Sequence, residues 1–150
     1  MAVTNAFSEQ IRAFAKKADA RANLVVKKIL FDVGSKLVLK SPVGDPKYWK
    51  RPAPPGYVGG RFRANWQYGS NSINKTTTMQ IDKAGAATIG KLQGSIGDRV
   101  LGEVHFITNS LPYAIPLENG WSWRQAPNGM VQVTVLEFDP IVRAAAAELT

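Results

Sequence analysis

Few residues of this chain are of the types that usually carry out catalysis. His105 is the only histidine, and the chain has no cysteine. A Ser-His-Asp triad would need His105, but no G-x-S-x-G motif is present to expose a nucleophilic serine. One histidine without cysteine also leaves a zinc ion short of ligands. We therefore predict neither a triad nor a zinc site, and interpret His105 as a structural or exposed residue.

The spacing of the acidic residues and of the glycines indicates no other catalytic centre. The Asp and Glu residues are scattered along the chain, and no close pair suggests glycosidase chemistry. Residues 85–92 nearly match a phosphate-binding loop, but Leu92 stands where a Ser or Thr is needed to hold magnesium. We interpret this match as chance. The prediction is a protein that is not an enzyme and has no metal and no cofactor; an enzyme such as a nuclease or hydrolase is the weakest alternative.

Basic and aromatic residues alternate in one stretch of the sequence, and this stretch is the better candidate for function. Its basic members are Lys47, Lys50, Arg51, Arg61 and Arg63, and its aromatic members are Tyr48, Trp49, Tyr57, Phe62 and Trp66. Such a mixture suits phosphate contact with base stacking. Trp, Tyr and Arg are equally the residues that dominate protein–protein interfaces. Both interpretations stay open at this point.

Charge is distributed unevenly along the chain. The 150 residues carry a net charge of +8; residues 1–75 hold 14 basic and 4 acidic residues, and residues 76–150 hold 5 and 7. This asymmetry indicates a nucleic acid, a phosphate surface or an acidic protein as partner, or head-to-tail contact between copies. A solvated basic face is the alternative. The length suits a single domain over 1–150. No membrane-spanning run or signal peptide is visible, so we expect no membrane partner.

The first element that positions these residues is one long amphipathic helix over 5–40. Its apolar stripe recurs at steps of three or four residues: Phe7, Ile11, Phe14, Ala18, Ala22, Val25, Ile29, Val33 and Leu37. The helix ends at Ser41-Pro42. At about 1.5 Å per residue it is longer than a compact domain needs. We expect a kink or a close contact at Gly34, or an end that reaches a neighbouring subunit.

An extended arm over 41–60 follows the helix. Nine of these twenty residues are Pro or Gly, which excludes a helix or a central strand. Because the arm also carries Tyr48, Trp49 and Tyr57, two interpretations stay open. Either the arm docks on another molecule, or its aromatic residues fold back onto their own domain.

A β-sheet body with helices is predicted over 61–150. Alternation of apolar and polar residues predicts strands over 61–70, 99–108 and 130–138, with a further strand near 76–81. Helices are predicted over 83–96 and, as a tight turn ended by Gly120, over 112–119, with a loop over 121–128. The last helix is expected to start at Asp139-Pro140; the alternative starts at Thr134, with Glu137 completing a capping box. The fold class is α+β: a long N-terminal amphipathic helix packed on a small antiparallel β-sheet, with a short middle helix and a C-terminal helix.

Two sequence blocks resemble a known family. The first runs from Ser41-Pro-Val-Gly-Asp-Pro to Gly60-Arg-Phe-Arg-Ala-Asn-Trp66, and the second from Asn109-Ser-Leu-Pro-Tyr-Ala through Leu117-Glu-Asn-Gly to Gln125-Ala-Pro-Asn-Gly-Met-Val131. Both blocks, in this order, resemble the neck and tail-completion (head–tail joining) proteins of tailed bacteriophages, of the lambdoid tail-component type. The resemblance covers nearly the whole chain.

The resemblance implies a structural virion protein that is assembled in the host cytoplasm. It implies a homo-oligomer, a sixfold ring at the neck, that contacts head-completion (stopper) proteins and tail-terminator or tail-tube proteins, with genomic DNA passing through its lumen without sequence specificity. We predict subunit or ring contacts at Tyr48, Trp49, Tyr57, Arg61, Arg63 and Trp66, and a structural corner at the 113–120 turn with Trp121 and Trp123. A basic nucleic-acid-binding module without enzymatic activity is the alternative.

Overall fold

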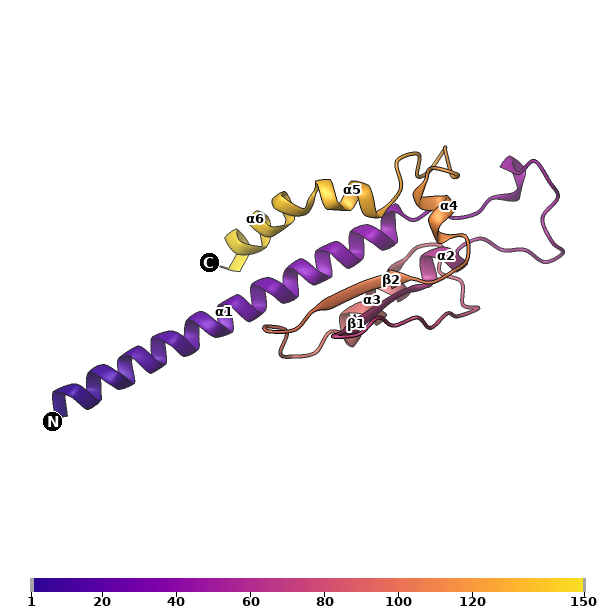
Figure 1. The fold of residues 1–150 in the computed structure, drawn as a ribbon. Helices are drawn as coiled ribbons and strands as arrows, with labels where there is room; N and C mark the ends of the chain where they lie inside the picture. The colour runs from indigo at the N-terminus through magenta and orange to yellow at the C-terminus, as the bar shows by residue number, and fades with distance from the viewer. Residues whose placement is uncertain (1, 150) are drawn as a thin grey trace.

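The long helix is the axis of the molecule. The computed structural model describes residues 2–149, and α1 spans Ala2–Lys40 as a single helix of 39 residues (Figure 1). The predicted helix is thereby confirmed. Gly34 does not interrupt it. A Cβ atom at Gly34 would lie 3.4 Å from Leu92 Cδ1, which confirms the expected close contact.

Two layers cover the C-terminal half of α1. On one side lie α3 (Ala86–Ser95) and a two-stranded antiparallel sheet of β1 (Trp66–Ser70) and β2 (His105–Asn109), with Trp66 opposite Asn109. On the other side lies α6 (Phe138–Leu149), as Figure 1 shows. The core between these layers is apolar and contains, among others, Leu37, Val38, Trp66, Leu92, Val100 and Met130. This confirms the predicted α+β class.

The first predicted strand begins later than expected. Residues Arg61–Ala64 form the short helix α2, and only Trp66–Ser70 is a strand. The spacing of Phe62 and Trp66 fits one face of a helical turn as well as one face of a strand, and their rings pack edge to face at 6.1 Å. The Asn65 side chain, which donates to the Arg61 carbonyl, closes this turn.

The strands predicted near 76–81 and over 99–104 are absent from the described chain. The backbone N–H and C=O of Thr78 bind the side-chain amide of Asn65 at 2.8 and 3.1 Å, so this amide takes the place of a partner strand. Near the other segment, Gly102 has a φ of +81°, and Asn71 accepts a hydrogen bond from Val104 N. The chain turns here, and β2 begins only at His105.

The strand predicted over 130–138 is wrong. Residues Val131–Leu136 form α5, which is followed directly by α6. The Glu118 carboxylate accepts hydrogen bonds from the backbone N–H of Met130, Val131 and Gln132, so it caps the start of α5. This distant cap outweighs the β-preference of a valine-rich segment.

The C-terminal helix and the 112–119 turn are confirmed with small shifts. The helix α6 begins at Phe138, one residue before the expected Asp139, and not at Thr134. The turn is α4 (Ala114–Glu118), and Gly120 after it has a φ of +86°. Within residues 2–149, no helix is long and apolar enough to span a membrane.

Candidate functional site

The arm folds back against the body of its own chain. Its base is held by the Gln125 side chain, which accepts from Val43 N at 2.9 Å and donates to Val43 O at 2.7 Å. Further along, Pro46–Tyr48 form a short 3-10 helix, and the rings of Trp49 and Tyr57 pack at 4.6 Å. The folded-back interpretation of the arm therefore describes this subunit. Docking on another molecule stays a prediction.

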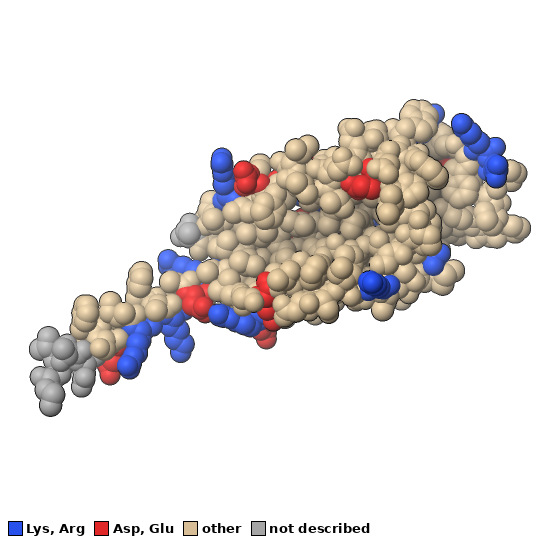
Figure 2. Space-filling view, in the orientation of Figure 1, with Lys and Arg blue, Asp and Glu red and all other residues tan. Residues whose placement is uncertain are grey.

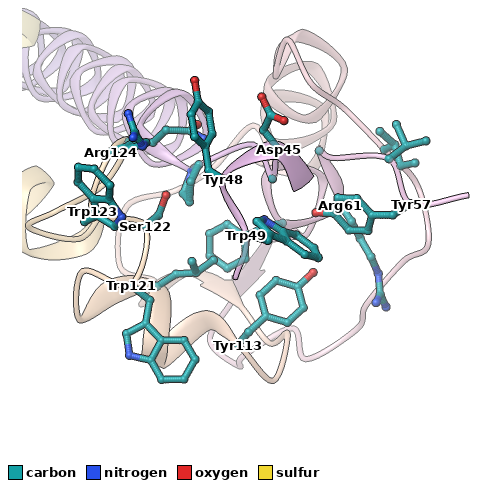
Figure 3. A pocket seen from close by; sticks show the side chains of 18 of the residues that line it. Asp45, Tyr48, Trp49, Tyr57, Arg61, Tyr113, Trp121, Ser122, Trp123 and Arg124 are labelled. Atoms are coloured by element: carbon teal, nitrogen blue, oxygen red, sulfur yellow. The ribbon is translucent and has the colours of Figure 1, made fainter. Parts of the chain in front are cut away.

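This folding creates a pocket between the arm and the turn after β2, which we call the aromatic pocket. Its volume is about 630 Å³. Figure 3 shows Trp49 and Tyr113 in its centre, with Tyr48, Trp123 and Arg124 grouped on one side. The aromatic residues of its wall come from four parts of the chain: Tyr48, Trp49, Tyr57, Phe62, Tyr113, Trp121 and Trp123.

Cations accompany the aromatic rings of this pocket. The Arg124 guanidinium lies 4.3 Å from the ring centres of both Tyr48 and Trp123, so it is stacked between them. The Arg61 Nε donates to the Thr78 carbonyl at 3.1 Å, which holds that side chain in the wall. Burial raises the pKa of both Tyr57 and Tyr113. Both phenols are therefore uncharged at neutral pH and offer an O–H donor to a bound partner.

Trp121 and Trp123 are more exposed than expected for a structural corner. Their exposed fractions are 74% and 67%, although α4 and Gly120 build the predicted turn beside them. Exposed indole rings beside a pocket are typical of a binding surface rather than of a packed corner. The aromatic pocket is therefore the best candidate for an interaction site in the described chain.

The six predicted contact residues divide into two groups. Tyr48, Trp49, Tyr57 and Arg61 line the aromatic pocket. Arg63 and Trp66 do not; they bind the end of α1 instead. Arg63 donates to the carbonyl oxygens of Leu39 and Ser41, and the buried Trp66 donates from Nε1 to Ser41 Oγ at 2.7 Å. Burial lowers the pKa of Arg63, and an arginine remains charged even so.

Sequence reasoning missed the second wall of the pocket. Trp121, Trp123 and Arg124 form a dense cluster of interface-type residues within four positions, and this was the available signal. What the sequence did not provide was their neighbour. Tyr48 lies more than 70 positions away and meets Arg124 only in the folded chain.

His105 has a structural role. Its Nδ1 lies 2.9 Å from the Tyr68 hydroxyl, and its Nε2 lies 2.9 Å from the Val100 carbonyl. Because a carbonyl only accepts, Nε2 carries a hydrogen, and in the neutral ring Nδ1 accepts from the Tyr68 hydroxyl. Both ring nitrogens are thus used within the fold. Among the residues that the structure describes, no group of three His, Asp or Glu side chains is placed to hold a metal ion.

In the segment 85–92, which nearly matches a phosphate-binding loop, an aspartate already binds the backbone N–H groups that a phosphate would use. The Asp82 carboxylate accepts from the backbone N–H of Gly85 and Thr88 and from the Thr88 hydroxyl, each at 2.8 Å. Burial alone would raise the pKa of Asp82, but these bonds and Arg63 lower it, and the pKa lies below its usual value. A phosphate at the start of α3 would meet this negative charge, which agrees with a chance match.

A second uncovered surface lies at the other end of the molecule. Residues 6–22 of α1 are exposed and extend beyond the body (Figures 1 and 2). Figure 2 shows Lys and Arg side chains along this projecting part and near the arm, with Asp and Glu side chains scattered over the face between them. The molecule therefore has two candidate interaction surfaces at opposite ends.

The chain was compared with protein-family models, with curated proteins and with solved structures. None of the three comparisons found a match. Function is therefore inferred from the sequence blocks, the aromatic pocket and the projecting part of α1.

Proposed function

We propose that this protein is a structural component of the neck of a tailed bacteriophage. It forms a ring at the head–tail junction, completes the tail and joins it to the head. One observation carries the proposal: the two sequence blocks that resemble this family meet in the fold. Asn109 Nδ2 donates to the Phe62 carbonyl at 2.8 Å, Trp66 pairs with Asn109, and the Phe62 and Tyr113 rings lie 5.9 Å apart. The two blocks therefore build one continuous structure, which supports reading them together.

The two uncovered surfaces also support this function. A subunit in a closed ring contacts one neighbour through one surface and the other neighbour through a different surface. The projecting part of α1 is one such surface, and the aromatic pocket is a separate uncovered surface. We assign Tyr48, Trp49, Tyr57 and Arg61, with Trp121 and Trp123, to contacts between subunits or with an adjacent ring. Arg63 and Trp66 contribute indirectly, because they hold the arm's starting point at Ser41.

The proposed partners are the head-completion (stopper) protein on one side and the tail-terminator or tail-tube protein on the other. Genomic DNA passes through the ring without sequence specificity. The net charge of +8 suits a surface near DNA, because Lys and Arg neutralise phosphates irrespective of sequence. The protein acts as a joint in the virion and performs no catalysis.

The test is particle assembly with and without the protein. In the phage that encodes this chain, inactivating the gene should leave DNA-filled heads and separate tails, counted by electron microscopy. Wild-type protein supplied in trans should restore joined particles, and a Trp49→Ala/Tyr57→Ala variant should restore few. Val104→Ala, at an exposed residue outside the pocket lining, is the matched control and should restore them fully. Joined, infectious particles in the absence of the protein would overturn the proposal.

Binding of single-stranded nucleic acid is a second candidate function. It is favoured by the stack of Tyr48, Arg124 and Trp123 beside the exposed Trp121, since aromatic and guanidinium faces receive bases. The exposed arm residues Lys47, Lys50 and Arg51 would contact phosphates. An oligothymidine should then quench tryptophan fluorescence, with an affinity that falls steeply with salt, and Trp123→Ala should weaken it. Absence of quenching at low salt removes this candidate.

A further inference from the structure

The projecting part of α1 presents an uncovered apolar triplet. Phe7, Ile11 and Phe14 are 63%, 52% and 73% exposed, and their i, i+4, i+7 spacing places them on one face of the helix. The same stripe continues to Leu37, where the body covers it. A solitary helical stretch of this length is only marginally stable in water. The triplet is therefore an apolar surface that its own subunit leaves uncovered.

A second triplet with the same spacing lies on the opposite layer. Val131, Val135 and Phe138 are 43%, 65% and 48% exposed. They belong to α5 and the start of α6, which lie end to end along α1 (Figure 1). Each triplet spans seven positions, or about 10 Å at the helical rise, so the two are matched in length.

Charge favours pairing between these two surfaces. Residues 6–22 hold four basic side chains, Arg12, Lys16, Lys17 and Arg21, against Glu9 and Asp19. Residues 131–149 hold Glu137, Asp139 and Glu148 against Arg143. Glu137 pairs with Lys36 and Lys40, and Glu148 with Lys28, of the same subunit, so Asp139 beside Phe138 is the acidic group offered to a second copy. The aromatic pocket is another exposed apolar surface, and its charged lining residues, Arg61, Arg124 and Asp45, sum to the same sign as the projecting helix. Opposite charge thus selects the α5–α6 surface over the pocket.

We propose that the projecting part of α1 packs against the α5–α6 surface of a second copy of this chain. Phe7, Ile11 and Phe14 of one copy meet Val131, Val135 and Phe138 of the next, with the helices parallel. Only this direction brings Lys16 and Lys17, just after the first triplet, level with Asp139, just after the second. Because the two surfaces differ, every subunit offers one of each, and the contact links copies in a closed ring or as a reciprocal pair. The inference rests on the proposed function only in that the protein acts as an oligomer.

Cysteine cross-linking tests the register directly, because the chain contains no cysteine. Phe14→Cys and Phe138→Cys are purified separately, mixed with an excess of wild type and oxidised. A disulfide requires Cα atoms within about 7 Å, so a 14–138 heterodimer should form in large excess over Phe14→Cys paired with Val104→Cys. A dominant Phe14→Cys homodimer would mean that the projecting helices pair with each other, and this would overturn the proposal, as would the absence of a heterodimer.

Charge reversal provides the second, independent measurement. Lys16→Glu/Lys17→Glu should weaken self-association, measured by sedimentation at low salt, by about tenfold or more. Asp139→Lys in the same chain should restore much of the loss. Lys50→Glu/Arg51→Glu on the arm makes the same change in net charge and should have no effect. Equal loss in both variants, or no rescue, would overturn the contact.

Vesicle binding and particle assembly separate this contact from a membrane role and from the neck function. Vesicles of phosphatidylglycerol and phosphatidylcholine probe a membrane role for the basic helix. Vesicle binding that Phe14→Glu abolishes, with self-association unchanged, would overturn the proposal.

If particles depend on the protein but Lys16→Glu/Lys17→Glu changes nothing, the contact is wrong and the neck function stands. If the cross-link forms but particles join without the protein, the contact stands and the neck function fails.

Discussion

The two halves of α1 have the same apolar spacing and different surroundings. Residues 6–22 are exposed, whereas Leu37 and Val38 near the other end are 5% and 0% exposed. Between them, Asp19 pairs with Arg99 and Asn23 accepts from Val100 N, which marks where the body begins to contact the helix. Periodicity therefore determines which face of a helix is apolar but not which molecule covers it.

The largest expected effect is a difference in unfolding free energy between substitutions in the covered half and in the exposed half of α1. Leu37→Ala removes a buried side chain from the core and should lower the free energy of unfolding by about 2–5 kcal/mol. Phe14→Ala, on the exposed half, should change it by less than about 0.5 kcal/mol. Urea unfolding of dilute, monomeric protein measures both. A cost at Phe14 comparable with that at Leu37 would show that the projecting half is covered within its own chain.

The next effect concerns the end of the covered half. Arg63→Leu removes the guanidinium that binds the Leu39, Ser41 and Lys83 carbonyls and should cost about 2–3 kcal/mol, because charged hydrogen bonds are among the stronger ones. Arg61→Leu is the matched control in the pocket wall, where one bond to Thr78 is lost. It should cost less than about 1 kcal/mol in urea unfolding. Equal costs would contradict the division of the predicted contact residues into two groups.

A pH-dependent effect concerns the layer that covers α1. Burial alone would raise the pKa of Glu118, but the N–H groups of Gln132, Val131 and Met130 lower it, and the pKa lies below its usual value. A lowered folded-state pKa means that the stabilisation is complete above the unfolded pKa of about 4.3 and is lost as pH falls through the folded one. Glu118→Gln should therefore cost about 1–2 kcal/mol at pH 7, and the difference from wild type should shrink below about pH 4.

Urea unfolding at a series of pH values measures this dependence. Glu9→Gln removes the same charge from the exposed half of α1 and should leave the unfolding free energy at pH 7 within about 0.5 kcal/mol of wild type. A Glu118→Gln difference that is constant with pH would show that the carboxylate's charge does not stabilise the start of α5.

The smallest effect is at Gly34, inside the covered half. Alanine gains helix propensity of up to about 1 kcal/mol, but its Cβ would approach Leu92 Cδ1 to 3.4 Å. We expect a net gain in stability of about 0.5 kcal/mol by thermal or urea unfolding. Gly90→Ala in α3 is the control, since a Cβ there meets no atom within 4 Å, and it should gain more. A loss at Gly34 would mean that α3 requires the closer approach that glycine permits.

Local patterns predicted the elements that depend on local interactions. The long stripe predicted α1, and Gly120 predicted the end of α4. The strand predicted over 130–138 was wrong because a short valine-rich run gives too little periodicity to distinguish a strand from an exposed helix. The deciding group, Glu118, lies 13 positions before Val131 and caps the helix only after the chain has folded.

The amino-acid sequence by itself determined the helix, the stiff arm, the uneven charge and four of the residues that line the aromatic pocket. These properties depend on residue type and on spacing along one segment. Tertiary structure alone decided that Trp121, Trp123 and Arg124 complete the pocket, that Arg63 and Trp66 are used inside the fold, and that the first half of α1 remains uncovered. The physical reason is that burial and side-chain pairing depend on which segments meet in space, and segments more than 20 positions apart carry no local signal of their contact.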